Sequence, residues 1–247
     1  MTKNLLDSKK ILAVIPARSK SKRIRNKNLR IFNKKPLIYW TIKAAQTSTL
    51  INKTLVSSDS INLLKKCKEF GVDYLIKRPN ILSNDTADSW DVVRHALSKL
   101  KKKNIFFDYI IMLQPTSPLR NSEHIDQCLK KLKKNNTGII SINRTLKPIE
   151  WQVNIRNENK FNLFKPGILK FKKNKRKNNT HIINGAIYAF KTEEVYKKNF
   201  IFKDSVNTFV MNIEDSIDID TNLEFKIAEF LKKQKSFFLN YKIKSIF

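Results

Sequence analysis

Residues 11–28 read ILAVIPARSKSKRIRNKN, and this stretch decides the fold. Its first part, Ile11 to Ile15, is an apolar run that stops at Pro16, as expected for a short buried β-strand. The following residues are rich in cationic side chains, namely Arg18, Lys20, Lys22, Arg23, Arg25, Lys27 and Arg30. Ligands of α/β proteins bind where parallel strands end, and such cations pair with phosphate oxygens. The stretch therefore predicts a triphosphate or pyrophosphate site, the alternative being a loop that is merely basic.

Apolar runs of strand length alternate with amphipathic helical patterns along most of the chain. We expect strands at 10–17, 53–57, 72–76, 108–113, 138–143, 184–190 and 208–213. Helices are expected at 36–47, 60–70, 87–100, 122–134, 192–198 and 221–233. Gly71 is expected to end the second helix, and Ser122 to cap the fourth. Successive β-α-β units predict an α/β fold with a mainly parallel sheet and helices on both faces.

The alternation breaks after Arg144. Residues 145–182 contain a short alternating run around Trp151, a proline at position 166 and a basic stretch over 172–177. This pattern indicates an excursion of hairpins rather than another β-α unit. A chain of 247 residues suits one large domain, which we place at 1–235 with the excursion inside it. Residues 236–247 are expected to form a C-terminal tail, either packed as a last element or mobile.

The composition excludes several classes of protein. Hydrophobic residues make up 41% of the chain, which fits a globular protein. No apolar run approaches the roughly 18 residues that a membrane span needs, and residues 1–10 lack a signal-peptide core, so we expect a cytoplasmic protein. Two cysteines among apolar neighbours and three scattered histidines indicate neither a disulfide framework nor a metal site. Neither a Walker loop nor a nucleophile–histidine arrangement appears, which argues against a P-loop ATPase and a covalent hydrolase.

The net charge of +29, from 50 basic and 21 acidic residues, first suggests nucleic-acid binding. The lysines, however, are scattered over expected exposed helix positions, and aromatic residues do not interleave with them in a stacking pattern. Lysine, asparagine and isoleucine are over-used together, which indicates a compositional drift of the whole chain. We therefore predict no specific nucleic-acid partner.

A second polar group follows the apolar strand expected at 108–113. It reads QPTSPLR from Gln114 to Arg120. Its two prolines fix the backbone, so that the side chains of Gln114, Thr116, Ser117 and Arg120 are held in place. This arrangement suits hydrogen bonding to a polyhydroxylated ligand. The alternative is a rigid turn that caps a helix.

A third group is acidic, in an otherwise basic chain, and consists of Glu214, Asp215, Asp218 and Asp220. Alternation in an extended segment places Asp218 and Asp220 on one face and Ile219 on the other. Two carboxylates on one face suit Mg²⁺, which completes its shell with waters and substrate phosphates. The alternative is that Asp220 caps the helix that begins at Thr221. Together with the cationic loop, these parts suit nucleotidyl transfer, in which a hydroxyl attacks an α-phosphate.

Five ordered motifs carry a resemblance to a known family. They are IPAR with KN at 27–28, RPxxLxxDxA at 78–87, QPTSPLR at 114–120, NGAIY at 184–188 and SIDIDT at 216–221. Over about residues 10–233, the chain resembles the acylneuraminate cytidylyltransferases, or CMP-sialic acid synthetases. The resemblance implies a three-layer α/β nucleotidyltransferase fold like that of nucleotide-diphospho-sugar transferases. It also implies a homodimer in which the excursion at 145–182 reaches into the partner subunit.

The family reaction joins CTP and a nonulosonic acid into a CMP-sugar and pyrophosphate, with Mg²⁺. Carried over by motif, the resemblance implies that three cations bind the CTP phosphates: Arg18, Lys22 and Lys27. Residues lining the nucleotide would be Asn28, Arg78, Ala87 and Ser89, and those facing the sugar acid Gln114, Asn184 and Tyr188. Asp218 and Asp220 would hold Mg²⁺, and the sequence leaves open which group accepts the proton of the anomeric hydroxyl. Catalysis would depend most on Lys27, Asp220 and Arg18.

The chain departs from the family pattern at two places. Lys20 and Arg23 stand where the family usually has glycine, and Ile182 and Ile183 stand where a basic residue often precedes NGA. The sugar carboxylate would then need another cation, such as Arg176 or a lysine of the partner subunit. Three alternatives stay open: a 3-deoxy-manno-octulosonate cytidylyltransferase, a degenerate homologue that binds CTP without turnover, and a basic nucleic-acid binder. The sequence KN at 27–28 argues against the octulosonate enzyme, because the corresponding motif of that family typically ends in KP.

Overall fold

A computed structural model describes residues 6, 8–19, 21–84, 86–145, 153–157, 160–163 and 180–244. Seven strands form one sheet in the order β11-β7-β10-β6-β1-β4-β5. Their bounds are β1 Ile11–Pro16, β4 Lys53–Ser58, β5 Tyr74–Lys77, β6 Tyr109–Met112, β7 Gly138–Arg144, β10 His181–Lys191 and β11 Val206–Met211. All pairings in this sheet are parallel except those of β10 with β6 and β7. The predicted mainly parallel sheet is confirmed.

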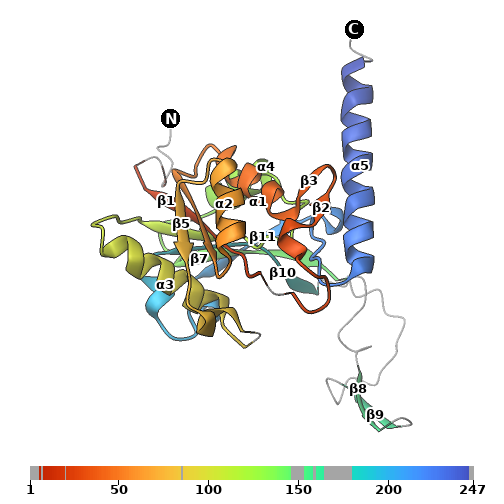
Figure 1. The fold of residues 1–247 in the computed structure, drawn as a ribbon. Coiled ribbons are helices and arrows are strands. Elements are labelled where there is room, and N and C mark those ends of the chain that lie inside the picture. The colour runs from red at the N-terminus through yellow and green to blue at the C-terminus, as the bar shows by residue number, and fades with distance from the viewer. Residues whose placement is uncertain are drawn as a thin grey trace.

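Helices cover both faces of the sheet (Figure 1). One face carries α1 (Leu37–Gln46), α2 (Ile61–Glu69) and α4 (Ser122–Lys130), and the other carries α3 (Ser89–Lys101). The sequence of β1 is continuously apolar because its side chains enter the two cores in alternation. Ile11, Ala13 and Ile15 pack in the first core, and Leu12 and Val14 pack with α3 in the second. The three-layer arrangement is therefore built on a strand buried on both sides.

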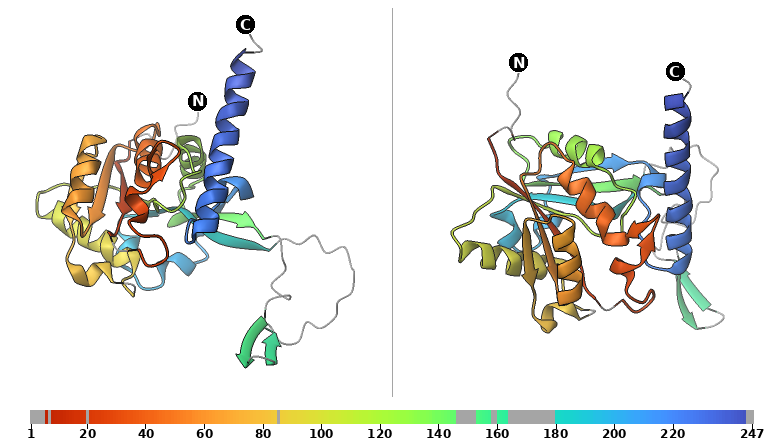
Figure 2. Two further views of the ribbon diagram at one scale, coloured as in Figure 1. Left: turned by 45° about the vertical axis from the view of Figure 1, so that its right-hand side comes forward. Right: turned by 45° about the horizontal axis from the view of Figure 1, so that its top comes forward.

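A third, smaller core lies under α5 (Asn222–Lys244), which runs along one side of the body and projects beyond it (Figures 1 and 2). It joins Phe225 and Ala228 of this helix to Phe32, Leu37 and Ile219. Phe32 belongs to a small hairpin of β2 (Ile31–Phe32) and β3 (Lys35–Pro36). The α5 helix continues past the predicted end at residue 233, through most of the segment expected as a tail.

Helix ends largely follow their local signals. The Ser60 side chain accepts a hydrogen bond from the Leu63 amide at 3.2 Å and caps α2. Gly71 adopts a φ of +76° after α2 and ends the helix, as predicted. The predicted cap of α4 was wrong, because Asn121 and not Ser122 is the cap. The side-chain Oδ1 of Asn121 accepts from the His124 backbone amide at 2.9 Å, and the Asn121 backbone amide donates to His124 Nδ1 at 3.3 Å. This reciprocal pair leaves Ser122 inside the first turn.

The helix predicted at 192–198 is reduced to a single 3-10 turn, η4 (Glu194–Tyr196), followed by a second turn, η5 (Phe200–Phe202). The carboxylate of Glu194 is buried and binds the ammonium groups of Lys197 and Lys203. Because Lys203 reaches back to Glu194, the chain folds around this carboxylate instead of continuing as a helix.

The excursion contains one described hairpin, in which β8 (Val153–Asn157) pairs antiparallel with β9 (Lys160–Leu163). This hairpin lies away from the sheet in the views of Figures 1 and 2. It agrees with the predicted hairpin character of the excursion, in which residues 146–152, 158–159 and 164–179 are outside the described ranges. Within the described part of the chain, no helix has the length and apolar character that a membrane crossing requires.

Candidate active site

A cavity of about 680 Å³ opens at the carboxyl ends of β1 and β6. Four segments that lie far apart in the sequence line it: the loop after β1, the segment around η2 (Asn80–Ser83) and the start of α3, the loop after β6, and the chain before α5. The cavity brings together these predicted site residues: Arg18, Lys22, Lys27, Asn28, Arg78, Ala87, Ser89, Gln114, Asp218 and Asp220. The predicted position at the carboxyl edge of a parallel sheet is therefore where these side chains converge.

The loop after β1 is fixed at both ends. The Ser19 amide and hydroxyl donate to the Asp59 carboxylate at 2.8 and 2.6 Å. Asn28 donates from Nδ2 to the Arg18 carbonyl at 2.8 Å, so this residue shapes the loop as well as facing the cavity. Sequence analysis missed Asp59, although an acidic residue directly after the strand that neighbours β1 was a usable signal. Lys20 lies outside the described residues.

Cations dominate this side of the cavity. Arg18, Lys22, Arg23, Lys27 and Arg78 line it, against the carboxylates of Asp218 and Asp220. Arg78 is buried, and no hydrogen-bond partner is found for its Nε atom among the described residues. Burial lowers the pKa of the Arg78 guanidinium, Asp59 raises it, and the positive charge of Arg18 lowers it further. A buried cation crowded by a second cation is the electrostatic arrangement expected for binding an anion.

The acidic side of the cavity shows the predicted alternation. Asp218 and Asp220 face the cavity, while Ile219 between them is fully buried in the core under α5. The segment is held by a hydrogen bond from the Ile219 amide to the Thr116 carbonyl at 2.8 Å. The ammonium of Lys27 donates to the Ile219 carbonyl at 2.5 Å and to Asp220 Oδ1 at 3.3 Å. One lysine thus joins the cationic loop to the acidic segment.

Asp218 is accessible through the cavity, yet the surrounding walls exclude part of its water. This desolvation raises the pKa of Asp218, and the neighbouring charge of Asp220 raises it further, whereas Thr116 and Lys27 lower it. A carboxylate whose ionisation is disfavoured by burial and by a second carboxylate gains from a cation placed beside it. Among the described residues, no group of three or more His, Cys, Asp or Glu side chains converges as a metal site.

The alternative role of Asp220 as a helix cap is not what the structure shows. The α5 helix is capped by Thr221 and Glu224, whose side chains satisfy each other's backbone. Glu224 Oε2 accepts from the amides of Asp220 and Thr221 at 2.7 and 2.6 Å, and Thr221 Oγ1 accepts from the Glu224 amide at 3.4 Å. This capping box leaves the Asp220 carboxylate to the cavity. The T-x-x-E spacing was readable in the sequence and was missed.

Arg120 does not face a ligand, contrary to the sequence interpretation. It is fully buried, and its Nε donates to the Ala186 carbonyl at 3.1 Å. Its Nη2 donates to Thr41 Oγ1 at 2.8 Å and to the Gln114 carbonyl at 3.3 Å. Burial lowers the pKa of this guanidinium to about 9. Arg120 therefore braces the loop after β6 against β10, while Gln114 and Thr116 of the same loop line the cavity.

Strand β10 contributes the remaining predicted residues. Asn184 lies off the cavity wall, because its buried amide accepts from Ser141 Oγ at 2.6 Å and donates to Ser216 Oγ at 3.0 Å. Gly185 has a φ of +75°, and a Cβ there would lie 3.2 Å from Gln114 Oε1, so both conformation and space require glycine. Tyr188 is also off the cavity wall, although Asp218 is near enough to raise its pKa further after burial has raised it.

Solved structures identify the class of fold. A CMP:2-keto-3-deoxy-manno-octonic acid synthetase complexed with CTP matches with a TM-score of 0.66 at 17% identity, over 92% of this chain and 99% of that chain. A 4-diphosphocytidyl-2C-methyl-D-erythritol synthase matches with a TM-score of 0.66 at 11% identity, over 91% of this chain and 98% of that chain. These likenesses define an α/β fold of the nucleotidyltransferase type.

Sequence comparison then identifies the family. A family model described as cytidylyltransferase matches residues 12–245. The N-acylneuraminate cytidylyltransferase of Escherichia coli O18:K1:H7 is 34% identical over 232 residues, which are 92% of this chain and 53% of that protein. This chain therefore spans about half the length of that relative. The chain belongs to the cytidylyltransferase family, and the resemblance indicated by its motifs is confirmed.

Two further relatives match over nearly their whole length. The CMP-N,N'-diacetyllegionaminic acid synthase of Legionella pneumophila is 33% identical over 223 residues, which are 89% of this chain and 95% of that protein. A pseudaminic acid cytidylyltransferase of Campylobacter jejuni is 30% identical over 227 residues, which are 91% of this chain and 97% of that protein. These relatives are named for different sugar acids, so similarity alone selects none of them.

Proposed function

We propose that this cytidylyltransferase transfers CMP from CTP to the anomeric hydroxyl of a nonulosonic acid and releases pyrophosphate. One observation carries the proposal: a cationic loop and an acid pair face the same cavity at the carboxyl edge of the sheet. Family membership supplies the nucleotide, and the relatives are named for acylneuraminic, legionaminic and pseudaminic acids. The substrate is therefore of the nonulosonic acid type.

The cations suit the triphosphate. Arg18 and Lys22 offer charge-assisted hydrogen bonds to phosphate oxygens, and Lys27 lies between them and Asp220. Their charge offsets the negative charge that builds up on the departing pyrophosphate. In oxyanion holes, where preorganised donors also stabilise developing negative charge, removal of one donor costs roughly 10²- to 10³-fold in rate. Asn28, Arg78, Ala87 and Ser89 line the same cavity and would surround the rest of the nucleotide.

The loop after β6 is the best place for the sugar acid. Gln114 presents its side chain to the cavity on a backbone that Arg120 holds rigid. Tyr188 and Asn184 would act by supporting this wall. The residues that precede Asn184 are the exposed Ile182 and Ile183, so a cation for the sugar carboxylate has to come from elsewhere. Arg176, one candidate for it, lies outside the described residues.

Asp218 and Asp220 fit a magnesium ion. They are two oxygen donors on one wall, and the negative charge of Asp220 raises the pKa of Asp218, which a bound cation would offset. The cations proposed to bind the triphosphate line the same cavity. When bound there, Mg²⁺ would offset phosphate charge during the transfer. The orientation of the pair is set by this chain itself, through Ile219 in the core and Lys27 at the Ile219 carbonyl.

The test is a screen of pyrophosphate release. Sialic, legionaminic and pseudaminic acids, with 3-deoxy-manno-octulosonate as a comparison, are each combined with ATP, GTP, CTP or UTP and Mg²⁺. We expect release only with CTP and a nine-carbon α-keto acid. Release with the eight-carbon acid alone would contradict the assignment. Protection against melting by CTP without turnover of any acid would favour a degenerate homologue.

We further infer a homodimer, as the family resemblance implies, and, from the composition, a cytoplasmic location. The β8–β9 hairpin supports an assembly, because it lies away from the body that it would otherwise pack against (Figure 2). Light scattering coupled to gel filtration tests the dimer. A monomer at all concentrations used in the assay would contradict it.

A further inference from the structure

Both carboxylate oxygens of Asp220 are paired with a cation. Lys27 Nζ lies 3.3 Å from Oδ1, and Arg23 Nη2 lies 3.1 Å from Oδ2. Arg23 comes from the loop after β1 and lines the cavity beside Lys22. This pairing depends on Arg23, which stands at a position where the family pattern usually has an uncharged glycine.

The two cations differ in how firmly they are held. The Lys27 side chain is 13% exposed and also donates to the Ile219 carbonyl, so it belongs to the framework of the wall. The Arg23 side chain is 64% exposed and reaches Asp220 from a solvated loop. An exposed ion pair of this kind shifts an equilibrium by roughly two- to fivefold only. Arg23 is therefore the cation that can leave Asp220 at little cost.

We propose that Arg23 is a charge latch that exchanges Asp220 for phosphate when a divalent cation enters. This inference rests on the proposed function. A divalent cation takes carboxylate oxygens at close range, and it repels a guanidinium held on the same carboxylate. A planar guanidinium released beside the triphosphate finds the geometry that it binds well. Arg23 thus opposes the metal when the nucleotide is absent and supports the nucleotide when the metal is present.

The latch predicts opposite changes in two affinities when Arg23 is removed. In Arg23→Ala, the affinity for Mn²⁺ alone should rise about two- to fivefold, because its competitor for Asp220 is gone. The affinity for CTP in excess Mg²⁺, without a sugar acid, should fall by a similar factor, because a phosphate partner is lost. A merely structural role of Arg23 would weaken both. Mn²⁺ binding is followed by electron paramagnetic resonance and CTP binding by calorimetry, so neither readout depends on turnover.

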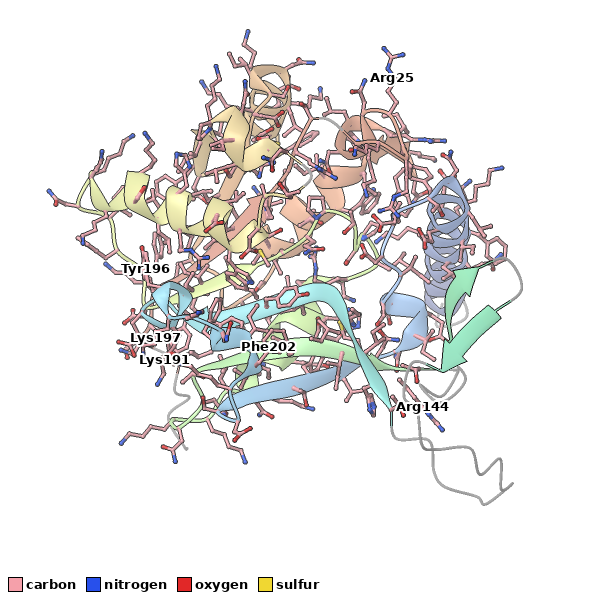
Figure 3. The ribbon with its side chains drawn as sticks, turned by 90° about the horizontal axis from the view of Figure 1, so that it is seen from below. Arg25, Arg144, Lys191, Tyr196, Lys197 and Phe202 are labelled. Carbon is pink, nitrogen blue, oxygen red and sulfur yellow. The ribbon has the colours of Figure 1, made fainter. Side chains whose placement is uncertain are left out.

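Arg25→Ala is the matched control. Arg25 is exposed on the same loop and is absent from the cavity lining. Its side chain projects outward into solvent (Figure 3). Replacement of Arg25 by alanine removes the same charge as Arg23→Ala. We expect both affinities of this variant to stay within experimental error of the wild type. An equal rise in Mn²⁺ affinity in both variants would overturn the latch, because general loss of positive charge would then explain it.

A variant at Asp220 tests whether the effect of Arg23 on Mn²⁺ binding acts through the Asp220 carboxylate. In Asp220→Asn, the further change Arg23→Ala should leave Mn²⁺ binding unaltered, because the shared carboxylate is gone. A twofold or larger rise in that background would contradict the latch. Failure of the wild-type protein to bind either Mn²⁺ or CTP would instead contradict the proposed function. Normal binding of both, with unchanged or weaker Mn²⁺ binding in Arg23→Ala, would contradict the latch alone.

Discussion

Two arginines contribute to the same cavity from regions that are built in opposite ways, Arg120 from behind its wall and Arg23 on its lining. Arg120 supports the loop after β6 from within the core, fully buried and bound to two carbonyls and a hydroxyl. Arg23 lies on the loop after β1, is largely exposed to solvent and is bound to one carboxylate. The first region fixes positions, because its polar groups have no water to turn to. The second adjusts charge, because its ion pairs compete with water and with each other.

The acid pair belongs to the rigid region, although its partners come from the loop. Ile219 anchors it in the core, and the Thr116 carbonyl holds the Ile219 amide. Changes on this side should therefore alter chemistry or stability strongly, and changes in the loop should alter affinities modestly. The following predictions are arranged from the largest expected effect to the smallest.

Asp220→Asn should lower kcat/KM by about 10³-fold or more, because an amide removes the negative charge that a metal ion needs. The fold should be unchanged, since Thr221 and Glu224 and not Asp220 cap α5. Steady-state pyrophosphate release and thermal melting measure the two parts. Glu214→Gln, a similar change at an exposed residue outside the cavity lining, is the control. Activity within tenfold of the wild type would remove Asp220 from the metal site.

Arg120→Met should destabilise the protein by about 3 kcal/mol, because two carbonyls lose their donor and the methionine fills only part of the space. Urea denaturation followed by circular dichroism measures the free energy of unfolding. CTP binding to the remaining folded protein should weaken as well, since the Gln114 loop loses its brace. A loss below 1 kcal/mol would show that the brace is not structural.

Lys22→Ala should raise the KM for CTP about tenfold, the effect of losing one charge-assisted hydrogen bond to phosphate. The midpoint of thermal unfolding should change little, because Lys22 is exposed. Arg25→Ala again serves as the comparison for charge alone. Equal KM values in these two variants would mean that the loop attracts CTP by its net charge rather than through defined contacts.

Asp59 gives the loop a small pH dependence. Burial raises the pKa of Asp59, but the hydrogen bonds from Ser19 and the charge of Arg78 outweigh it, so the pKa in the folded protein is lowered. Such a group stabilises the protein above its unfolded pKa, near 4, and the contribution is lost as the pH falls through the lower folded value. Asp59→Asn should cost about 1 kcal/mol at pH 7 and less at pH 3. A difference that grows in acid would contradict this sign.

The sequence predicted those features that local patterns determine. The strand at Ile11–Pro16, the loop after it and the alternation around Ile219 follow from periodicity within a few residues. The brace formed by Arg120 could not be predicted, because its acceptors lie on three elements that only the fold brings together. The lost helix at 192–198 has the same origin, since Lys203 reaches Glu194 only after the chain has turned. Tertiary contacts override local propensity in both cases.

The buried position of Ile219 has a consequence for how the protein would fail. The apolar side chain of Ile219 fixes the segment that carries Asp218 and Asp220, so the spacing of these two carboxylates depends on the small core under α5. With the proposed metal ion bound, loosening that core by heat or by a smaller residue at Phe225 should first change the preference among divalent ions of different radius. Selectivity for the ion would therefore report on the packing of this core and would change before the protein unfolded.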